Sequence, residues 1–476
     1  MRRTLLSGVL GVTACMDMDM HDGLAVPQVI GIPADSRAPE VAIALDENPD
    51  PDVVEVTLRA HETTREMLPG RRSTAWAYND TSPGPLIEAK VGDRVIVHFH
   101  NELDEPTSIH WHGLRIAADM DGGAEGPVVA AGQSFDFAFD VPDAGMFWYH
   151  PHEDAHRQIE RGLYGPILVR DDEEPDVDVE RVLVLDDVLI DDDGAIAPFS
   201  ERDDMLGRQG NLLLVDGIAH PTIAVRAGSI ERWRLVNVAN ARYFDLELPG
   251  HELVLVGTDG GLLEQGVLID RLLLAPGERA DVLVRMSATP GTQAELHTLP
   301  YDRGDGMGHM GMDWGDVEDL LQLAYTNAAP LPERAMPQPR GRVEPIRSTV
   351  GRDILVLGEG HGGCPHCDGP ALTINGESWP DVTPIVARLG DTRAWVLDNR
   401  SGMDHPFHLH GFRFQVLRGA GGGLPIAAWK DTVNVPAGEE VEIAVALDGF
   451  AGDWMYHCHI LEHADAGMMG LLEVRP

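Results

Sequence analysis

The chain has 476 residues, 43% of them hydrophobic, which is enough for about three domains with separate cores. Its formal net charge of −42 repels polyanions and argues against a nucleic-acid partner. There is no uninterrupted apolar run of about 18 residues, so no transmembrane segment is predicted.

The first 50 residues are predicted to be an export signal and a tether. Arg2 and Arg3 precede an apolar stretch that ends in Val12-Thr13-Ala14-Cys15, a pattern similar to a bacterial lipoprotein signal with Cys15 as the lipidated residue. The following residues, up to about 50, are rich in Pro and Asp and show no hydrophobic period. We therefore expect an exported bacterial protein, periplasmic or at the cell surface, with lipid anchoring at Cys15 as one option.

Residues 51–170 are predicted to form a first β-sandwich. Alternating apolar and polar residues, as in 93–99, lie between turns rich in Gly, Pro, Asn and Asp. Two histidine pairs occur here, His110-Trp111-His112 and His150-Pro151-His152. Side chains two positions apart lie on one face of a strand, so each pair presents two imidazoles to the same side.

Residues 171–330 show the same alternation but contain no histidine pair, which predicts a second sandwich that acts as a spacer. A loop of this region is rich in glycine and methionine. Thioether and imidazole groups suit Cu(I), and the loop offers four of them: Met307, His309, Met310 and Met312. The alternative is that these methionines fill irregular gaps in the packing.

Residues 331–476 are predicted to be a Pro-rich linker followed by a third sandwich. The motif from His405 to His410 places His408 and His410 on one strand face and His405 on the other. The motif His457-Cys458-His459 likewise places the cysteine opposite its two neighbours. One short strand can therefore serve two metal sites.

A blue copper centre uses two imidazoles, a thiolate and a weak axial thioether. Cys458, His463 and Met468 supply three of these ligands, and His405 has the parity needed for the fourth. The four His-x-His pairs supply eight further imidazoles, which are enough for a cluster of three coppers. Without a metal, burial would leave many of their donors and acceptors unpaired.

At these motifs the chain resembles the three-domain bacterial multicopper oxidases, which include laccase-like and cuprous-oxidase-like members. The resemblance extends from about residue 50 to the C-terminus and implies an all-β fold of three cupredoxin-like Greek-key sandwiches. It also implies four copper ions: one type 1, one type 2 and two type 3. Carried over by position, the type 1 ligands are His405, Cys458, His463 and Met468, the type 2 ligands are His110 and His408, and the type 3 ligands are His112, His150, His152, His410, His457 and His459.

The resemblance implies a laccase-type reaction, in which four one-electron oxidations of phenols or aromatic amines reduce one O2 to water. Electrons would pass from Cys458 through its bonded neighbours, His457 and His459. Asp121 matches the position where the family has an acid near the trinuclear cluster, and it is predicted to deliver protons; the alternative is a turn residue before two glycines. Many bacterial relatives have an acid directly after the type 1 histidine, whereas this chain has Ala464, which leaves the second proton route open.

The alternative function is a cuprous oxidase in copper tolerance, which would use the same ligands with Cu(I) as its reductant. Met403 matches a methionine that cuprous oxidases of the family use beside type 1 copper. A copper nitrite reductase would not need four histidine pairs. A copper-free relative that only binds partners would be expected to have lost ligands.

Two further motifs have other interpretations. Residues 152–156 match the zinc-protease pattern H-E-x-x-H, which requires a helix, whereas His152 belongs to a predicted strand pair. Cys364 and Cys367 are predicted to close a small disulfide or to bind a metal with His361 and His366. Their flanks resemble a loop and lack the strand-to-helix setting of a thioredoxin-like redox motif.

Overall fold

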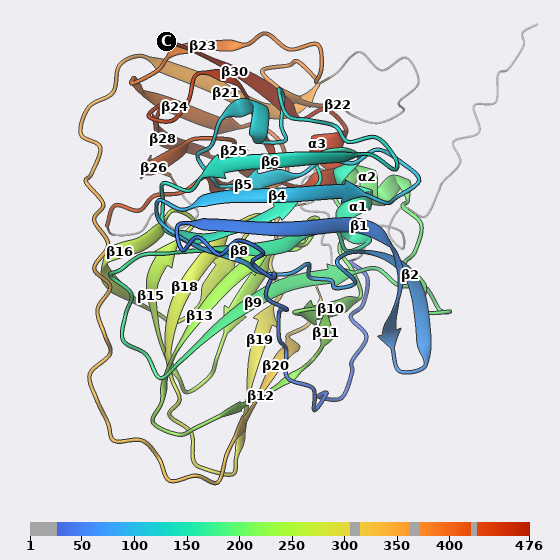
Figure 1. Ribbon diagram of the computed structural model, residues 1–476, viewed down its shortest axis with the longest axis vertical. Helices are drawn as coiled ribbons and strands as arrows, with labels where there is room; N and C mark the ends of the chain where they lie inside the picture. The colour runs from blue at the N-terminus through green and yellow to red at the C-terminus, as the bar shows by residue number, and fades with distance from the viewer. Residues whose placement is uncertain (1–25, 305–314, 361–370, 420–425) are drawn as a thin grey trace, which may run out of the picture.

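The computed structural model describes residues 26–304, 315–360, 371–419 and 426–476. Its regular structure there is almost entirely β, and six sheets pack as three pairs (Figure 1). We call these pairs the first, second and third sandwich in chain order. Within the described ranges, no helix is both long enough and apolar enough to cross a membrane.

The first sandwich packs the sheet β2-β1-β4-β6 against the sheet β3-β8-β7-β5. In β4 the buried residues alternate with more exposed ones, as the period of the sequence predicted. Tyr78 and Tyr149, one from each sheet, are in ring contact within the shared core. The strands are β1 (Val53–Leu68), β2 (Arg71–Tyr78), β3 (Ile87–Lys90), β4 (Arg94–Asn101), β5 (His110–His112), β6 (Ser134–Asp140), β7 (Gly145–His150) and β8 (Gly165–Arg170).

The second sandwich packs the seven-stranded sheet β11-β10-β9-β13-β18-β15-β16 against the five-stranded sheet β12-β20-β19-β14-β17. Trp233 and Leu321, from opposite sheets, are buried in its core. The strands are β9 (Val179–Val188), β10 (Leu212–Val215), β11 (Ile218–Ala219), β12 (Thr222–Val225), β13 (Ile230–Asn237), β14 (Phe244–Glu247), β15 (Glu252–Thr258), β16 (Gly261–Ile269), β17 (Leu272–Leu274), β18 (Arg279–Arg285), β19 (Gln293–Leu299) and β20 (Glu318–Tyr325).

The third sandwich packs the sheet β22-β21-β24-β28-β26 against the sheet β23-β30-β29-β25-β27. Trp395 and Tyr456 meet edge to face between the sheets, in the same core as Cys458. The strands are β21 (Arg352–Gly360), β22 (Ala371–Ile374), β23 (Ile385–Arg388), β24 (Thr392–Asn399), β25 (His405–Leu409), β26 (Arg413–Arg418), β27 (Thr432–Val435), β28 (Glu440–Ala446), β29 (Gly452–Cys458) and β30 (Met469–Arg475).

The described helices are short and follow the histidine motifs or cover them. They are η1 (Ala118–Met120), α1 (Ala155–Glu160), α2 (Glu201–Leu206) and α3 (Leu461–Asp465). Ser200 caps α2 by accepting a hydrogen bond from the backbone of Asp203, whose side chain returns the contact. Because α3 contacts both α1 and α2, one segment from each sandwich meets at this point.

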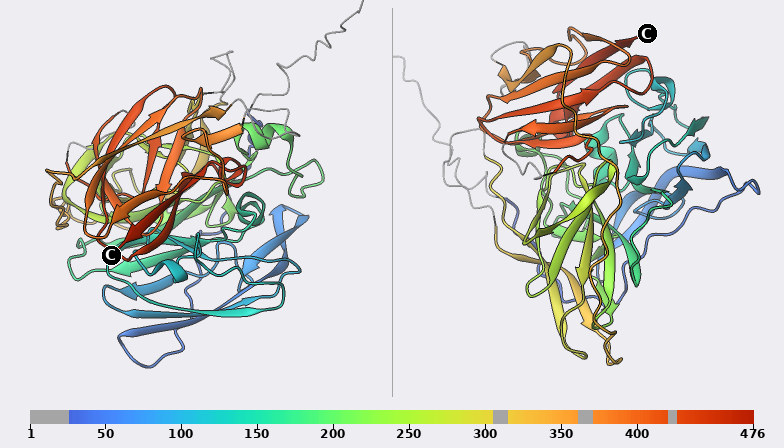
Figure 2. Two further views of the ribbon diagram at one scale, coloured as in Figure 1. Left: turned by 90° about the horizontal axis from the view of Figure 1, so that it is seen from above. Right: turned by 90° about the vertical axis from the view of Figure 1, so that its left-hand side faces the viewer.

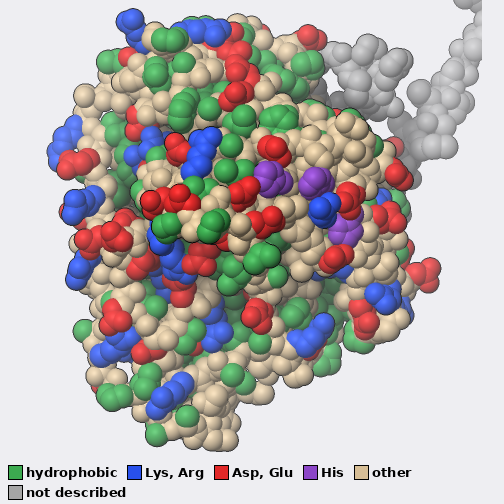
Figure 3. All heavy atoms as spheres, in the orientation of Figure 1, with side chains coloured by type: hydrophobic (Ala, Val, Ile, Leu, Met, Phe, Trp, Pro, Cys, Tyr) green, Lys and Arg blue, Asp and Glu red, His purple; other side chains and the backbone are tan. Residues whose placement is uncertain are grey.

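All three sandwiches touch one another. Figure 2 shows the third, in orange to red, lying across the first, in blue to teal, and the second, in green to yellow. Arg115 pairs with Asp448 between the first and third sandwiches, and Tyr164 donates a hydrogen bond to Asp186 between the first and second. On the face drawn in Figure 3, acidic side chains are scattered among basic ones, as expected for a solvated acidic surface.

The first and third sandwiches share a strand register near their histidine motifs. Tyr149 of β7 lies opposite Gly165 of β8, and Tyr456 of β29 lies opposite Gly470 of β30. A Cβ atom at either glycine would come within 2.3 Å of the tyrosine ring. Both positions therefore require glycine for the ring to lie flat across the neighbouring strand.

Asp216 provides a test of how pH acts on this fold. Its backbone φ is 49°, one carboxylate oxygen accepts a hydrogen bond from the Val184 N–H at 2.7 Å, and the other is buried without a partner among the described residues. Burial raises the pKa of Asp216 to about 7. The folded protein therefore binds the proton more tightly than the unfolded chain, and stability is lost as the pH rises from about 4 through 7.

We expect Asp216→Asn to relieve this loss, because the amide stays neutral, keeps the acceptor oxygen and tolerates a positive φ. Its stabilising effect should grow by about 2–3 kcal/mol between pH 5 and pH 8. Chemical unfolding of both proteins at the two pH values measures the change. Asp216→Ala, which removes the contact with Val184, is the matched control, and an Asn effect that did not vary with pH would contradict this explanation.

Candidate metal centres

A buried cluster in the third sandwich joins a thiol and two imidazoles. His405 begins β25 and Cys458 ends β29, and the two strands are paired. The Cys458 Sγ lies 3.4 Å from the His405 Nδ1 and 3.8 Å from the His463 Nδ1. Met468 is fully buried in the same core, and its carbonyl accepts a hydrogen bond from the Cys458 N–H at 3.1 Å. The four residues that the blue-copper pattern predicted are thus brought together.

The outer nitrogen of each imidazole is anchored, which turns the inner one toward the sulfur. The His463 Nε2 donates to the Met205 carbonyl at 3.1 Å, and the His405 Nε2 lies 2.8 Å from the Ser401 hydroxyl. Burial lowers the pKa of His405 to about 3 and that of His463 well below its usual value, so both rings are neutral. Burial also raises the pKa of the Cys458 thiol to about 12. A thiolate here therefore needs a bound cation.

The eight paired histidines meet between the first and third sandwiches. Strand pairing places His110 opposite His150 and His408 opposite His457. Across the interface, the ring of His110 stacks on that of His410 with their centroids 3.7 Å apart. All eight side chains except the half-buried His152 are buried. Pairs from both sandwiches therefore form one site, as the sequence predicted.

Within this site the imidazoles form groups in which the ligand atoms lie within 4.8 Å of one another, and some groups share a residue. Two triads have no residue in common: one takes two histidines from the first sandwich and one from the third, and the other takes one from the first and two from the third. The six histidines expected at the type 3 pair are thereby divided equally, which their spacing in the sequence does not predict. The groups are His112, His150 and His459; His152, His410 and His457; and His110, His112 and His408.

Three pairs of Nε2 atoms face each other, and in two of them, His410 with His457 and His110 with His408, all four rings donate outward through Nδ1, so both inward lone pairs face each other. The Nε2 atoms of His410 and His457 lie 3.1 Å apart, while the Nδ1 of His410 donates to Asp121 and that of His457 donates to the Cys458 carbonyl. His152 and His457 approach to 3.3 Å, and His110 and His408 to 3.4 Å, through the same atom type. Facing lone pairs repel, so these contacts fit a shared cation between the rings.

Other ring nitrogens of the cluster are buried without any hydrogen-bond partner among the described residues. They are the Nδ1 of His112, the Nε2 of His150 and both ring nitrogens of His459. Burial holds the pKa values of these histidines well below the ordinary value, so the rings are neutral and can act as ligands. Neutral imidazoles here, and imidazoles with a thiol and a thioether in the smaller cluster, form a donor set that suits copper.

Asp121 lies at the edge of the imidazole cluster. Its Oδ2 accepts a hydrogen bond from the His410 Nδ1 at 2.7 Å and lies 3.3 Å from the His110 Nδ1, and its Oδ1 is buried without a partner among the described residues. Gly122 follows with φ 79°, and a Cβ atom there would overlap the Ile109 carbonyl. Asp121 is thus both a turn residue and a buried acid in contact with the predicted metal site.

Asp431 and Arg279 belong to this site, although the sequence did not single them out. The Asp431 Oδ1 accepts from the His112 Nε2 at 3.1 Å, and its carbonyl accepts from the His408 Nδ1 at 3.0 Å. Arg279 reaches over from β18 of the second sandwich and donates to both carboxylate oxygens at 2.6 Å. Burial alone would raise the pKa of Asp431, but Arg279 outweighs it and holds that pKa well below its usual range. The prediction that the second sandwich is only a spacer is therefore incomplete.

The sequence has no acid directly after His463, but the structure shows a buried acid directly before it. Asp465 follows Ala464, and its carboxylate lies 2.6 Å from the His156 Nδ1. The residue that sequence reasoning missed is Glu462, a buried acid whose Oε1 accepts a hydrogen bond from Asn240 at 2.8 Å and whose pKa burial raises to about 7.

His156 lies on α1, which begins only at Ala155, so residues 152–156 lack the helical setting of a zinc protease.

The substrate residues proposed from the sequence are only partly described. Met403 is buried, and its carbonyl accepts hydrogen bonds from Asn399 and Ser401. In the described ranges the one free cysteine is Cys458. Outside those ranges lie Cys15, Met307, His309, Met310, Met312, His361, Cys364, His366 and Cys367.

Family models described as multicopper oxidase match residues 59–174, 148–294 and 361–476. The multicopper oxidase MmcO of Mycobacterium tuberculosis is 31% identical over 87% of this chain and 85% of its own, and a laccase of Haloferax volcanii is 30% identical over 86% and 79%. The solved structure of a multicopper oxidase from Campylobacter jejuni, described as a metallo-oxidase, has 29% identity and a TM-score of 0.81, and covers 95% of this chain and 96% of that one.

The fold and these matches define a copper-dependent oxidoreductase built from three cupredoxin-like sandwiches. The chain belongs to the multicopper oxidase family. Its class, its fold and O2 as the electron acceptor, which the resemblance at the histidine motifs implied, are thereby confirmed.

Proposed function

We propose that the enzyme is a laccase-type oxidase for small phenols and aromatic amines, coupling four one-electron oxidations to the reduction of O2 to water. The observation that carries the proposal is the strand β29 and its extension. Cys458 belongs to the thiol cluster, while its bonded neighbours His457 and His459 belong to the two separate histidine triads. Two redox sites joined by one short stretch of chain suit an enzyme that collects single electrons and delivers them four at a time.

We propose four bound copper ions. The type 1 ion would be held by His405, Cys458, His463 and Met468. The type 2 ion would be held by His110 and His408, and each type 3 ion by one of the two triads. When bound, copper supplies the one-electron redox chemistry and the affinity for O2. The unpartnered nitrogens of His112, His150 and His459 support this assignment.

The protein groups orient the ligands and exclude water. Outward hydrogen bonds fix the Nδ1 of His150 on the Pro151 carbonyl and that of His457 on the Cys458 carbonyl, both at 2.8 Å, so the Nε2 atoms face inward. The hydrogen bond of His457 also ties the imidazole site to the backbone of the thiol cluster. Met468 would hold the type 1 ion weakly through its thioether, which should give a lower reduction potential than an apolar side chain would.

Asp121 is proposed to hold and pass protons, because it contacts His410 and has a free buried oxygen. We expect Asp121→Asn to lower kcat by about 100-fold, since an amide cannot exchange a proton in this role. Copper content should not change. Oxygen uptake and metal analysis measure both quantities. Asp119→Asn, an exposed change in the same turn, should have no effect; equal turnover in the two variants would leave Asp121 as a turn residue only.

A cuprous oxidase is the second candidate, supported by the buried Met403 near His405 and by the metallo-oxidase among the similar structures. As a laccase, the copper-loaded protein should show a higher kcat/KM for a phenol than for Cu(I), with oxygen uptake in both assays. As a cuprous oxidase, it should show the reverse order.

The methionine-rich loop gives an independent test of the same choice. If the enzyme is a laccase, deleting residues 307–312 should change Cu(I) and phenol oxidation by the same factor, because the loop then has only a packing role. Replacing the same six residues with a glycine and serine segment is the matched control for loop length. A loss of Cu(I) oxidation at least tenfold larger than the loss of phenol oxidation would assign the reductant as Cu(I).

We propose that the chain is exported to the periplasm or cell surface, on the pattern Arg2-Arg3 followed by an apolar stretch and Cys15. The proposed units are a signal and tether at 1–50, sandwiches at 51–170 and 171–330, and a linker with the third sandwich at 331–476. The mass of the mature protein would reveal cleavage before Cys15 and any attached lipid.

A further inference from the structure

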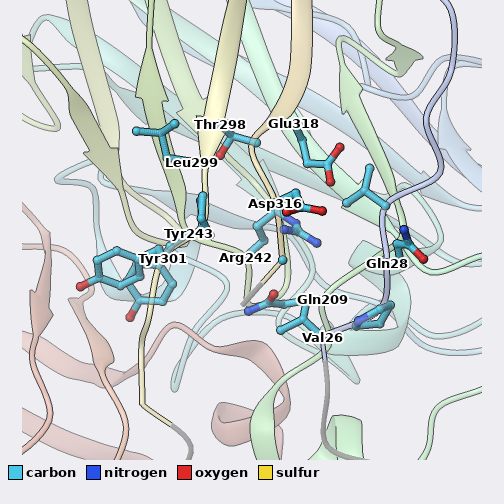
Figure 4. Close-up of a pocket in the computed structure, with 14 residues that line it drawn as sticks. Val26, Gln28, Gln209, Arg242, Tyr243, Thr298, Leu299, Tyr301, Asp316 and Glu318 are labelled. Atoms are coloured by element: carbon cyan, nitrogen blue, oxygen red, sulfur yellow. The ribbon is translucent and has the colours of Figure 1, made fainter. Parts of the chain in front are cut away.

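A cavity of about 330 Å³ lies beside the second sandwich, next to the chain at residues 26–29 (Figure 4). Its walls include the rings of Tyr243 and Tyr301 and the side chains of Thr298 and Leu299, and two carboxylates, Asp316 and Glu318, also line it. The volume is at the lower end of the range for small-molecule sites, which suits a single aromatic ring.

The two tyrosines connect this cavity to the thiol cluster. Their rings stack with centroids 4.9 Å apart and planes at 19°. The Tyr301 hydroxyl donates to the Asp404 Oδ2 at 2.7 Å, and Asp404 is bonded to His405. The Tyr243 hydroxyl donates to Asn434 at 2.9 Å, and Asn434 in turn donates to Asp404 at 2.8 Å. Because Tyr301 itself lines the cavity, one hydrogen bond and the peptide bond between Asp404 and His405 connect the cavity wall to His405.

The charges of the cavity favour a cation. Arg242 also lines it, but its guanidinium donates to the buried Asp187 at 2.5 Å and to the Gly210 carbonyl at 2.7 Å. Arg242 also acts electrostatically on Glu318, so its single positive charge is shared between Asp187 and the lining acids. Among the described lining residues Asp316 and Glu318 therefore outnumber the one cation. A ring with a cationic amine matches both the stacked aromatic wall and these two acids.

We propose that this cavity binds single-ring aromatic amines that carry a positive charge, and that it is an entry port for electrons on the His405 side of the thiol cluster. The proposal rests on the laccase-type function above. Each bound amine loses one electron and its ammonium proton, so an N–H bond breaks and the amine leaves as its radical cation. Four such electrons and four protons reduce one O2 to two water molecules, so the family's own oxidant completes the balance.

The test uses two reductants and one ligand that cannot be oxidised under the assay conditions. N,N-dimethyl-p-phenylenediamine, assayed at a mildly acidic pH at which it is protonated once, is the cationic aromatic substrate. Ferrocyanide is an anionic reductant without an aromatic ring, and benzylammonium is the inert ligand. The double variant Asp316→Asn and Glu318→Gln should raise the KM for the diamine about tenfold and leave the kinetics with ferrocyanide unchanged. Glu333→Gln, an exposed change outside the cavity that removes one negative charge, is the control for a general effect of surface charge.

Calorimetry with benzylammonium reports binding without turnover. Wild type and Glu333→Gln should bind it equally, and the double variant about tenfold more weakly. Leu299→Trp, which fills the cavity and keeps its charges, should weaken both benzylammonium binding and diamine oxidation. Unchanged binding and KM in the cavity variants would overturn the proposal. If copper-loaded wild type fails to oxidise even ferrocyanide, the proposed oxidase function itself is wrong. Calorimetry distinguishes this failure from a failure of the cavity proposal, because it measures benzylammonium binding without turnover.

Discussion

Replacing Cys458 with serine is expected to lower the oxidation of every reductant by more than about 1000-fold, a loss of about 4 kcal/mol in transition-state stabilisation. A serine hydroxyl is a hard, protonated group and cannot replace the soft thiolate that holds a blue copper ion between His405 and His463. The visible absorption should disappear and the copper content should fall by about one ion per chain. Absorption spectra, metal analysis and oxygen uptake measure the three effects.

The control for this change alters the same cluster and keeps its thiolate. Met468→Leu removes only the weak axial thioether, so colour and copper content should remain while the reduction potential rises. Both replacements are close in size to the native residue in a buried core, which keeps the fold comparable. A Cys458→Ser protein that stayed blue and active would show that the thiolate site lies elsewhere.

The positions of Cys458 and His405 could be predicted from sequence because the argument uses only the twofold period of a strand. In the structure β25 pairs with β29, Phe407 lies opposite Cys458, and His408 lies opposite His457. Successive side chains of these two strands therefore point alternately into the core of the third sandwich and toward its interface with the first, as the twofold period of a strand predicts. Local geometry of this kind does not depend on how the sandwiches dock, which explains why the prediction succeeds.

The division of the histidines into two triads could not be predicted in this way. Each triad takes imidazoles from both the first and the third sandwich, as in the contact of His112 with His459. Which rings meet depends on the relative placement of two sandwiches that are about 300 residues apart in the chain. Spacing within one motif carries no information about that placement.

Sequence reasoning missed Arg279 for a different reason. It follows the turn Pro276-Gly277-Glu278 and begins a strand, where an arginine is ordinarily solvent-exposed. Its side chain is instead fully buried and donates to carbonyls of Met146, Gly277 and Asp259 as well as to Asp431. The N–H groups of this buried guanidinium find their acceptors in all three sandwiches. Its role can therefore be recognised only once the relative placement of the sandwiches is known.

We therefore expect Arg279→Gln to destabilise the copper-free protein by about 3–5 kcal/mol, because it leaves the Asp431 carboxylate buried and unpaired. The same change frees Asp431 to move away from the His112 Nε2, so the trinuclear site should bind less copper while the blue absorption of the thiol cluster persists. Thermal unfolding without metal and copper analysis of the loaded protein measure these two results.

Two further variants distinguish the effect of the positive charge of Arg279 from the effect of its bidentate contact with Asp431. Arg279→Lys keeps the charge but replaces a two-pronged donor with one ammonium group, so it should recover most of the stability and little of the trinuclear copper. The double variant Arg279→Gln and Asp431→Asn removes the unpaired charge and should recover stability in the same way. If either variant also regained full trinuclear copper, the bidentate contact would not be what holds His112 and His408 in place. The second sandwich would then contribute stability to this site and no orientation.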